Sequence, residues 1–189
     1  DPKQLQSAVE DIIETCTYGA IKPSELTAYD LEYIFLNLRA VSVGETVEVG
    51  IKCEHCDKVN QIVVNLKEIK VQFPEVEPET TIMLEKDIGI TMKPITLGAT
   101  KLLADDAEIT DMVGLVIDTI FDKDNVYPTK DSTVEEIKDF VESLNREQLG
   151  KIQEYISNQP KLIHTVEFKC IHCGEMNKIT LEGLQSFFA

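Results

Sequence analysis

Apolar residues recur at helical spacing in the first part of the chain and predict helices there. Residues 3–17 place five of them on one helical face: Leu5, Val9, Ile12, Ile13 and Cys16. Pro23 and Ser24 indicate a turn and the start of a helix. Asp30 caps a further helix over residues 30–42, which ends at Gly44. Its largely apolar surface predicts burial of five side chains: Leu31, Ile34, Phe35, Leu38 and Val41.

Alternation of apolar and polar residues predicts two β-hairpins that lie far apart in the chain. In the first, residues 46–53 place Val47, Val49 and Ile51 on one face, and residues 59–66 form the return strand. In the second, residues 162–170 and 175–184 form the two strands. A β-rich stretch at residues 70–96 follows the first hairpin, and Ile88, Ile90 and Met92 alternate within it.

The pattern changes to helices from Leu97 onwards. Residues 97–122 predict one or two helices with five core candidates: Met112, Leu115, Val116, Ile120 and Phe121. After a loop at residues 124–133, residues 133–145 form a helix capped by Ser132 or Thr133. Another helix over residues 146–159 stops before Pro160, and a short helix ends the chain.

Four of the five cysteines form two CxxC pairs, Cys53/Cys56 and Cys170/Cys173, within a local repeat. At a constant offset of 117 residues the flanks match as well: Val49 with Val166, Ile51 with Phe168, Lys52 with Lys169, His55 with His172, Asn60 with Asn177 and Ile62 with Ile179. Two residues between cysteines let both thiolates of one turn reach one ion, and two turns supply a tetrahedron of sulfur. We therefore predict a closed, structural zinc site made by Cys53, Cys56, Cys170 and Cys173, with backbone N–H groups of the turns donating to the sulfurs.

Other roles of the two CxxC pairs stay open at this point. A CxxC pair can be a redox dithiol, although no thioredoxin-like βαβ pattern surrounds either pair. Disulfides, an iron–sulfur cluster and two hairpins without metal are further alternatives. The long separation of Cys56 from Cys170 is acceptable for a shared metal site, because the entropic cost of closing a loop grows slowly with its length.

The remaining reactive side chains suggest no catalysis. Because four thiolates complete a ligand set, His55 and His172 are expected to be exposed turn residues, and His164 an ordinary strand residue. Cys16 is expected to be a small core residue, since no nearby His or Asn would activate it. The acidic pairs Asp105/Asp106 and Glu135/Glu136 are expected to be helix-surface charge. No glycine-rich phosphate loop, GxSxG or HExxH motif occurs, so the sequence predicts no enzyme and no organic cofactor.

Together these elements predict an α+β fold: helices with a small zinc-ribbon-like β module built from two CxxC hairpins. No Gly/Ser-rich linker and no low-complexity segment interrupts the chain, which favours a single mixed domain over residues 1–189. Within it, residues 46–66 and 163–182 form the paired zinc-knuckle hairpins. Residues 97–159 form a helical insertion between them.

The chain is strongly acidic, with a formal net charge of -16 from 34 acidic and 18 basic residues. Such a chain repels phosphate backbones, which argues against a zinc-ribbon protein that binds nucleic acid. We expect most of the acidic residues to lie on solvated helix faces rather than in a docking patch. No apolar run is long enough to cross a bilayer, and the polar start DPKQLQSAVED is not a signal peptide.

Residues 29–49, YDLEYIFLNLRAVSVGETVEV, resemble the baseplate hub protein family of T-even-like bacteriophages. The specific part is DLEYIFLNLRA followed by SVGE; it stands beside an acidic helix at residues 1–16, and the order of segments also agrees. The family usually begins with a further N-terminal stretch, which fits the absence of an initiator Met here. Arg39 is a cation on a largely apolar helix, so we expect it either to pair with an acid or to face a partner.

This resemblance implies a non-enzymatic structural or assembly protein of a contractile tail baseplate hub. Its partners would be other hub or tail proteins, and neither nucleic acid nor a membrane. It would occur in the host cytoplasm during assembly and in the tail baseplate of the virion. The alternatives are a CxxC-based redox protein and an assembly chaperone that is absent from the finished particle. The contacted subunits, the stoichiometry and the oligomeric state do not follow from the sequence.

Overall fold

The computed structural model of the chain describes residues 2–101 and 109–188. By their internal contacts the residues separate into two compact units. Unit 1 comprises Asp1–Pro23, Ala28–Gln72 and Pro160–Ala189, and unit 2 comprises Ser24–Thr27 and Phe73–Gln159. A single mixed domain over the whole chain stays a prediction.

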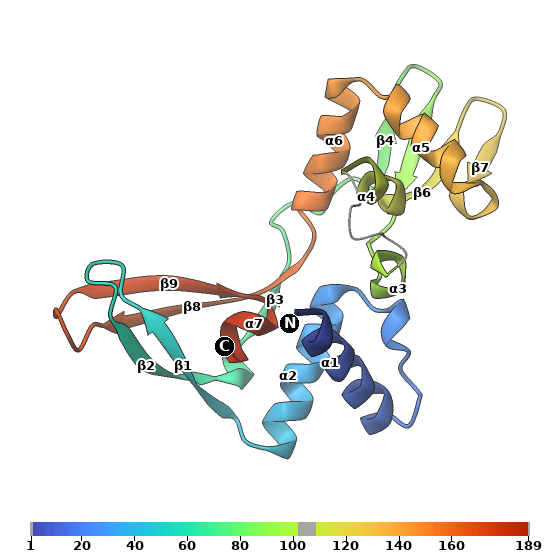
Figure 1. Cartoon of the computed structure of the whole chain (residues 1–189). Helices are drawn as coiled ribbons and strands as arrows, with labels where there is room; N and C mark the ends of the chain where they lie inside the picture. The colour runs from blue at the N-terminus through green and yellow to red at the C-terminus, as the bar shows by residue number, and fades with distance from the viewer. Residues whose placement is uncertain (1, 102–108, 189) are drawn as a thin grey trace. The chain divides into compact units, whose positions relative to one another are not determined.

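Unit 1 contains the two predicted hairpins, which have the same strand register. Its helices are α1 (Pro2–Cys16), α2 (Ala28–Ser42), η2 (Leu66–Glu68) and α7 (Gly183–Phe188), and its strands are β1 (Thr46–Lys52), β2 (Val59–Asn65), β3 (Lys70–Gln72), β8 (Lys161–Lys169) and β9 (Met176–Glu182) (Figure 1). In the described residues β1 pairs with β2, and the other strands form a sheet in the order β3-β8-β9. Lys52 lies opposite Val59, and Lys169 lies opposite Met176 at the matching place in the repeat. The local repeat in the sequence is therefore a structural repeat.

One face of each hairpin is buried. Val49 and Ile51 on β1 are 3% and 6% exposed, and Val166 and Phe168 on β8 are similarly buried. Each buried aliphatic or aromatic side chain contributes about 1.5–3 kcal/mol to folding relative to an exposed one. The alternation of apolar and polar residues along each strand therefore predicts which face of the strand contacts the core.

The helix carrying the apolar run, α2, begins at Ala28, so Asp30 lies within its first turn and the predicted cap at Asp30 is wrong. The buried residues are Leu31, Leu36 and Ala40, whereas Val41 is 86% exposed and its predicted burial is also wrong. Positions 36 and 40 lie one turn apart on the side that packs inward, and position 41 is rotated away from it. The ring of Phe35 meets Phe188 of α7 edge to face, at 5.8 Å between centroids.

Helix α1 packs through a narrow stripe. Val9 and Ile13 are 1% and 0% exposed, while Leu5 and Ile12 flank them and are more than a third exposed. Cys16 is exposed, so the prediction that it is a core residue is wrong. The apolar face of α1 is therefore wider than its buried stripe, and Cys16 belongs to the exposed part of that face.

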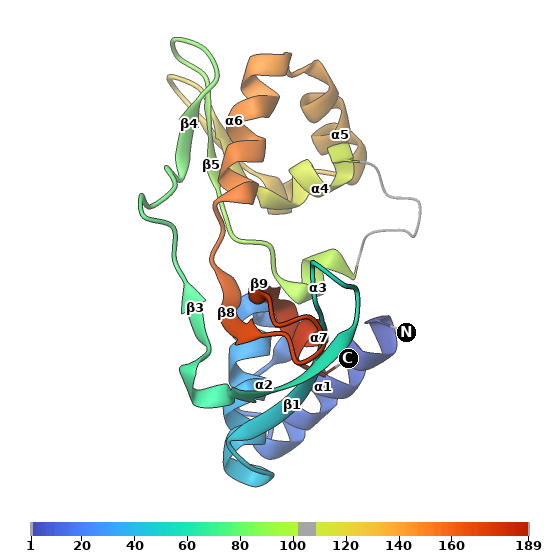
Figure 2. The same cartoon turned by 90° about the vertical axis from the view of Figure 1, so that its left-hand side faces the viewer.

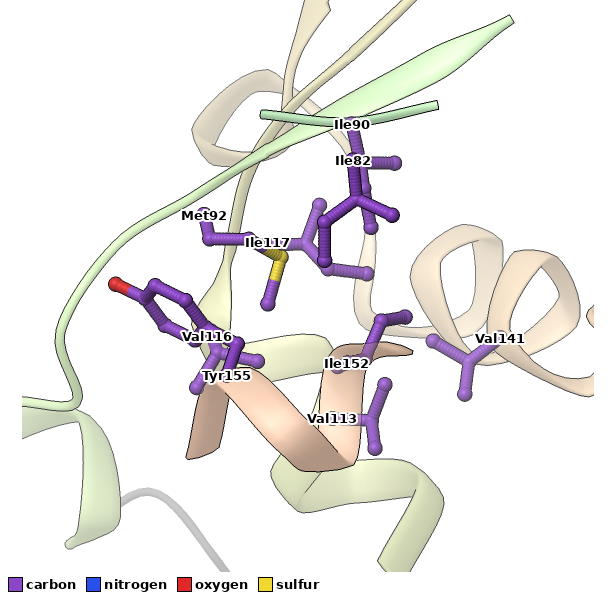
Figure 3. Close-up of a cluster of buried hydrophobic side chains, with 9 residues drawn as sticks. All are labelled: Ile82, Ile90, Met92, Val113, Val116, Ile117, Val141, Ile152 and Tyr155. Atoms are coloured by element: carbon purple, nitrogen blue, oxygen red, sulfur yellow. The ribbon is translucent and has the colours of Figure 1, made fainter. Parts of the chain in front are cut away.

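Unit 2 packs helices against one face of an antiparallel sheet. Its strands are β4 (Thr81–Met83), β5 (Gly89–Met92), β6 (Ile117–Phe121) and β7 (Val126–Pro128), and among the described residues they lie side by side in the sheet in this order. Its helices are α3 (Leu97–Thr100), α4 (Ile109–Val116), η3 (Thr129–Asp131), α5 (Val134–Ser143) and α6 (Arg146–Ser157). A further short helix, η1 (Pro23–Glu25), leads into residues assigned to this unit. The core joins the strands to α4, α5 and α6 through Ile82, Ile90, Met92, Val113, Val116, Ile117, Val141, Ile152 and Tyr155 (Figure 3).

The predicted helix over residues 97–122 is wrong in its last part, which is strand β6. Residues 117–121, IDTIF, are rich in β-branched and aromatic side chains and pair with β5. Met112 is 42% exposed, and Val113 next to it is buried in its place. The loop predicted at residues 124–133 contains β7 and η3, so the segment expected to be a helical insertion also contains strands. The helix surface expected at Asp105 and Asp106 lies outside the described residues.

The last two helices of unit 2 begin with reciprocal caps. The hydroxyl of Thr133 accepts the N–H of Glu136, and the carboxylate of Glu136 accepts the N–H of Thr133. Asn145 and Gln148 make the same pair of bonds at the start of α6. The cap predicted at Ser132 or Thr133 is therefore Thr133, as the TxxE spacing favours. Across residues 2–101 and 109–188, the helices are all too short or too polar to span a bilayer.

Candidate metal centre

The two CxxC turns close in the same way. The N–H of the first cysteine donates to the carbonyl five residues later, at 2.9 Å for Cys53 and 2.9 Å for Cys170. The residue that follows each second cysteine has a left-handed backbone, with φ 57° at Asp57 and 79° at Gly174. Glycine adopts this conformation without strain, and aspartate is among the residues that tolerate it. Each turn therefore directs both of its sulfurs to the same side.

The four cysteines of the pairs converge on one point. All four Sγ atoms lie within 4.8 Å of one another. Two of the separations cross between the hairpins: 3.6 Å from Cys53 to Cys173 and 3.7 Å from Cys56 to Cys170. Four sulfurs at zinc-bond length, about 2.3 Å from a central ion, would lie about 3.8 Å apart. The sulfurs are free thiols at the spacing of a tetrahedral metal site, so these residues could hold a metal ion.

Two buried asparagines hold the turns against each other. Asn60 and Asn177 follow the two turns at matching places in the repeat and are 1% and 2% exposed. The Oδ1 atom of Asn60 accepts the N–H of Ile171 in the opposite turn at 3.0 Å, and Oδ1 of Asn177 accepts the N–H of Glu54 at 3.0 Å. Each Nδ2 atom donates to a carbonyl of its own turn, at 3.0 Å from Asn60 and 3.1 Å from Asn177.

Sequence reasoning missed this role of the asparagines. The signal was present, because Asn60 and Asn177 match in the repeat, but a match does not show that each side chain crosses to the other hairpin. The crossing bonds relate the hairpins by an approximate two-fold arrangement around the sulfurs. They fix the relative placement of the two turns through protein atoms alone.

Backbone N–H groups surround the buried sulfurs, as predicted. The N–H of His55 lies 3.4 Å from Sγ of Cys53, and that of His172 lies 3.4 Å from Sγ of Cys170. Burial raises the pKa of the Cys170 thiol, but hydrogen bonds from the backbone of Cys173 and His172 outweigh it, and the pKa falls to about 6. Burial also raises the pKa of the Cys53 thiol. A hydrogen bond from the backbone of His55 lowers it, and the net result is a decreased pKa.

The second cysteine of each pair has the opposite tendency. A hydrogen bond from the backbone of Glu175 lowers the pKa of Cys173, but burial and the neighbouring thiols raise it to about 12. Hydrogen bonds from the backbone of Lys58 and from the Cys173 thiol lower the pKa of Cys56, but burial and the thiols of Cys170 and Cys53 outweigh them, so the pKa increases. The pKa is thus lowered at the two buried cysteines, Cys53 and Cys170, and raised at the half-buried Cys56 and the exposed Cys173.

The histidines of the turns lie outside the sulfur cluster. His55 and His172 are exposed, as predicted, and Nε2 of His172 lies 3.2 Å from the carbonyl oxygen of Val59 on the other hairpin. His164 lies in β8 and is half-buried, which agrees with an ordinary strand residue. If a metal ion were bound, four sulfurs would complete its tetrahedral ligand set and leave no position for water or substrate.

Arg39, in the apolar run of α2, bonds to the main chain and to no acidic side chain among residues 2–101 and 109–188. Its Nη1 atom donates to the carbonyl of Gly44 at 2.8 Å, across the end of the helix. The guanidinium therefore caps carbonyl groups where α2 passes into β1. This contact gives the cation a partner within its own chain, and the expectation that Arg39 faces another protein stays a prediction.

The whole chain matches the model of one known protein family. A family model described as T4 bacteriophage base plate protein matches residues 1–189. No significant match was found among the curated proteins or the solved structures.

Proposed function

Because the chain belongs to the T4 bacteriophage base plate protein family, we propose that it acts in the hub of the baseplate. The family match over residues 1–189 is the observation that carries this proposal. Membership indicates a structural, non-enzymatic role in the phage tail and contacts with other tail proteins. The assignment to the hub is supported by the resemblance of residues 29–49, and the proposal includes a stage in the host cytoplasm during assembly.

The second part of the proposal is that the four clustered cysteines bind one zinc ion. Thiolate ligands select zinc or iron–sulfur centres, and a single tetrahedral set of four sulfurs suits zinc. The cross-hairpin distances of 3.6 and 3.7 Å support this choice, since they match the edge of a zinc–sulfur tetrahedron. Zinc would supply a structural cross-link and no reactive position.

Such an ion would join two distant parts of the chain. The hairpin at residues 46–66 precedes all of the unit 2 segment 73–159, and the hairpin at 163–182 follows it. A metal shared by both hairpins keeps the ends of this long insertion together, and the entropic cost of the loop is compensated by metal binding. We therefore propose that the zinc fixes unit 1 as the base from which the inserted segment leaves and to which it returns.

The location of the protein tests the hub assignment. The full-length tagged chain would be expressed during infection, and soluble lysate, tail intermediates and finished particles would be separated by sedimentation. A structural hub component is expected in finished particles at fixed stoichiometry, and an assembly factor is expected on intermediates alone. Absence from both fractions would refute the proposal.

Matched cysteine variants test the part played by the metal site in the same experiment. The double variant Cys170→Ser/Cys173→Ser should be lost from tail fractions, because it removes half of the ligand set. Cys16→Ser is the control, since Cys16 is exposed on α1 and is not among the four clustered thiols. Equal incorporation of both variants would show that the cysteine cluster does not serve assembly.

A further inference from the structure

Strand β4 forms an edge of the unit 2 sheet. Among the described residues it pairs with β5 and with no second strand. Two backbone bonds mark which residues face β5: the N–H of Met92 donates to the carbonyl of Thr80 at 2.6 Å, and the N–H of Leu84 donates to that of Ile88 at 2.9 Å. Backbone groups of alternate residues in an antiparallel strand point to opposite sides.

This alternation directs the N–H and C=O groups of Thr81 and Met83 away from β5. The edge is short, but it offers four outward polar backbone groups in strand conformation. An exposed strand edge is a template onto which an extended peptide can add as a further strand. The side chain of Ile82 between them is 7% exposed and belongs to the core, so the edge is held on a fixed support.

A cavity of about 490 Å³ lies beside this edge. The chain before the strand, β4 itself and α6 line it, and Figure 2 shows β4 and α6 next to each other. From α6 come Lys151, Glu154 and Tyr155, and Asn158 follows directly at the end of the helix. A segment added to β4 would therefore have one side on the strand and its side chains in a preformed recess, which is the usual arrangement of strand addition.

The lining of this cavity is acidic and partly apolar. Glu77, Glu79 and Glu154 contribute carboxylates, and the cation Lys151 is already paired with Glu147 at 3.6 Å. Val76 is 80% exposed and Met83 is 45% exposed. Charge complementarity therefore favours an occupant with Lys or Arg side chains, and the exposed apolar side chains favour at least one apolar residue beside them.

We propose that β4 receives an extended, basic segment of a neighbouring tail protein, which adds as a fifth strand and directs an apolar side chain at Val76 and Met83. The identity of the neighbour as a tail protein rests on the proposed function. The chemistry of the segment rests on the edge and the cavity alone. A strongly acidic chain would in this way attach to a partner of opposite charge.

Site-specific photocrosslinking in infected cells tests this proposal on the full-length protein. A benzoylphenylalanine residue at position 76 should crosslink to one peptide of a different tail protein, and sequencing should show a net positive charge in that peptide. The same probe at position 134 is the control, since Val134 is 77% exposed on α5 and does not line the cavity. A crosslink to a second copy of this chain, an acidic peptide, or no crosslink above the control would overturn the proposal.

The strand-addition geometry has its own test. Met83→Pro removes an N–H that points away from β5, which an edge strand tolerates, and should lower the crosslink yield at position 76 about fivefold or more. Met83→Ala loses the same thioether but keeps the N–H, and should retain most of the yield. Equal yields from the two variants, with equal unfolding midpoints, would refute docking by backbone hydrogen bonds.

These results separate the docking site from the proposed function. Crosslinks are read in the whole lysate and again in sedimented particles. If the chain sediments with tail structures but gives no basic crosslinked peptide, the docking site alone is wrong. If a basic peptide is crosslinked but the chain occurs in neither intermediates nor particles, the hub assignment is wrong.

Discussion

Replacing Asn60 by alanine should weaken both metal binding and the stability of unit 1. The side chain is 1% exposed and makes two hydrogen bonds: it accepts from the N–H of Ile171 and donates to the carbonyl of Lys58, each at 3.0 Å. Alanine removes both bonds and leaves those backbone groups without their partner. The opposite turn also loses one of its hydrogen bonds to this hairpin, whereas the bond from the N–H of Glu54 to Asn177 remains.

The magnitude follows from these two bonds. Each net hydrogen bond contributes about 1 kcal/mol, and an unsatisfied buried group costs about 1–3 kcal/mol, so the zinc-bound protein should lose about 2–4 kcal/mol. Residues that orient metal ligands typically change metal affinity by about 10–100-fold. The two estimates overlap near 2 kcal/mol, or a roughly thirtyfold loss of zinc affinity.

Competition with a chromogenic chelator measures this affinity, and the cobalt(II) form provides a spectrum of the tetrahedral sulfur site. Asn177→Ala should give a similar loss, because its bonds repeat those of Asn60. Asn37→Ala is the matched control, since Asn37 is exposed and bonds within α2 to the carbonyl of Tyr33. An affinity of Asn60→Ala within about threefold of the wild type would refute the reasoning, because the cross-hairpin bond would then not position the ligands.

Three further predictions concern the core of unit 2, the pH dependence of stability in unit 1 and the effect of removing the metal. Ile152→Ala removes a fully buried core side chain of unit 2 and should lower its free energy of unfolding by about 2–5 kcal/mol in urea, whereas Val134→Ala on the exposed surface should change it little. Burial raises the pKa of Glu32 above its ordinary value of 4.5; a hydrogen bond from the backbone of Leu184 opposes this increase, and the nearby Glu182 adds to it. The folded protein therefore holds a proton on Glu32 more tightly than the unfolded chain does. The resulting contribution to folding stability is fully present below pH 4.5 and is lost as the pH rises through the folded-state pKa. Glu32→Gln keeps the acceptor oxygen; its stability relative to the wild type should therefore increase with pH through that range, and a constant difference would contradict this assignment. Removal of metal by a chelator should increase hydrogen exchange in β1, β2, β8 and β9 and leave the core of unit 2 protected; equal deprotection of both units would contradict the confinement of the metal to unit 1.

The two hairpins and their four cysteines were predictable because the information is local. A strand, a CxxC turn and a return strand lie within about twenty residues, and the same pattern occurs twice. The repeat also showed that the hairpins are equivalent. It did not show the crossed bonds of Asn60 and Asn177, because these depend on the placement of one hairpin against the other.

The errors have a common physical origin in tertiary contacts. Residues 117–121 follow a helix directly and continue its apolar positions with Ile117, Ile120 and Phe121, so periodicity alone could not separate the strand β6 from the helix α4. The exposure of Cys16 and Val41 depends on how much of a helix its neighbour covers, which the apolar pattern overestimates. The donation from Arg39 to Gly44 requires the actual end of α2, and helix ends are the least predictable part of a sequence pattern.

Metal content per chain tests the central claim most directly. Native mass spectrometry of the full chain, purified without added metal, would be combined with a thiol reagent under native conditions. One zinc per chain is expected, with Cys16 modified at once and the other four cysteines protected until a chelator is added. Four cysteines that react as fast as Cys16 on a metal-free chain, or a cluster containing iron, would contradict the proposed zinc site.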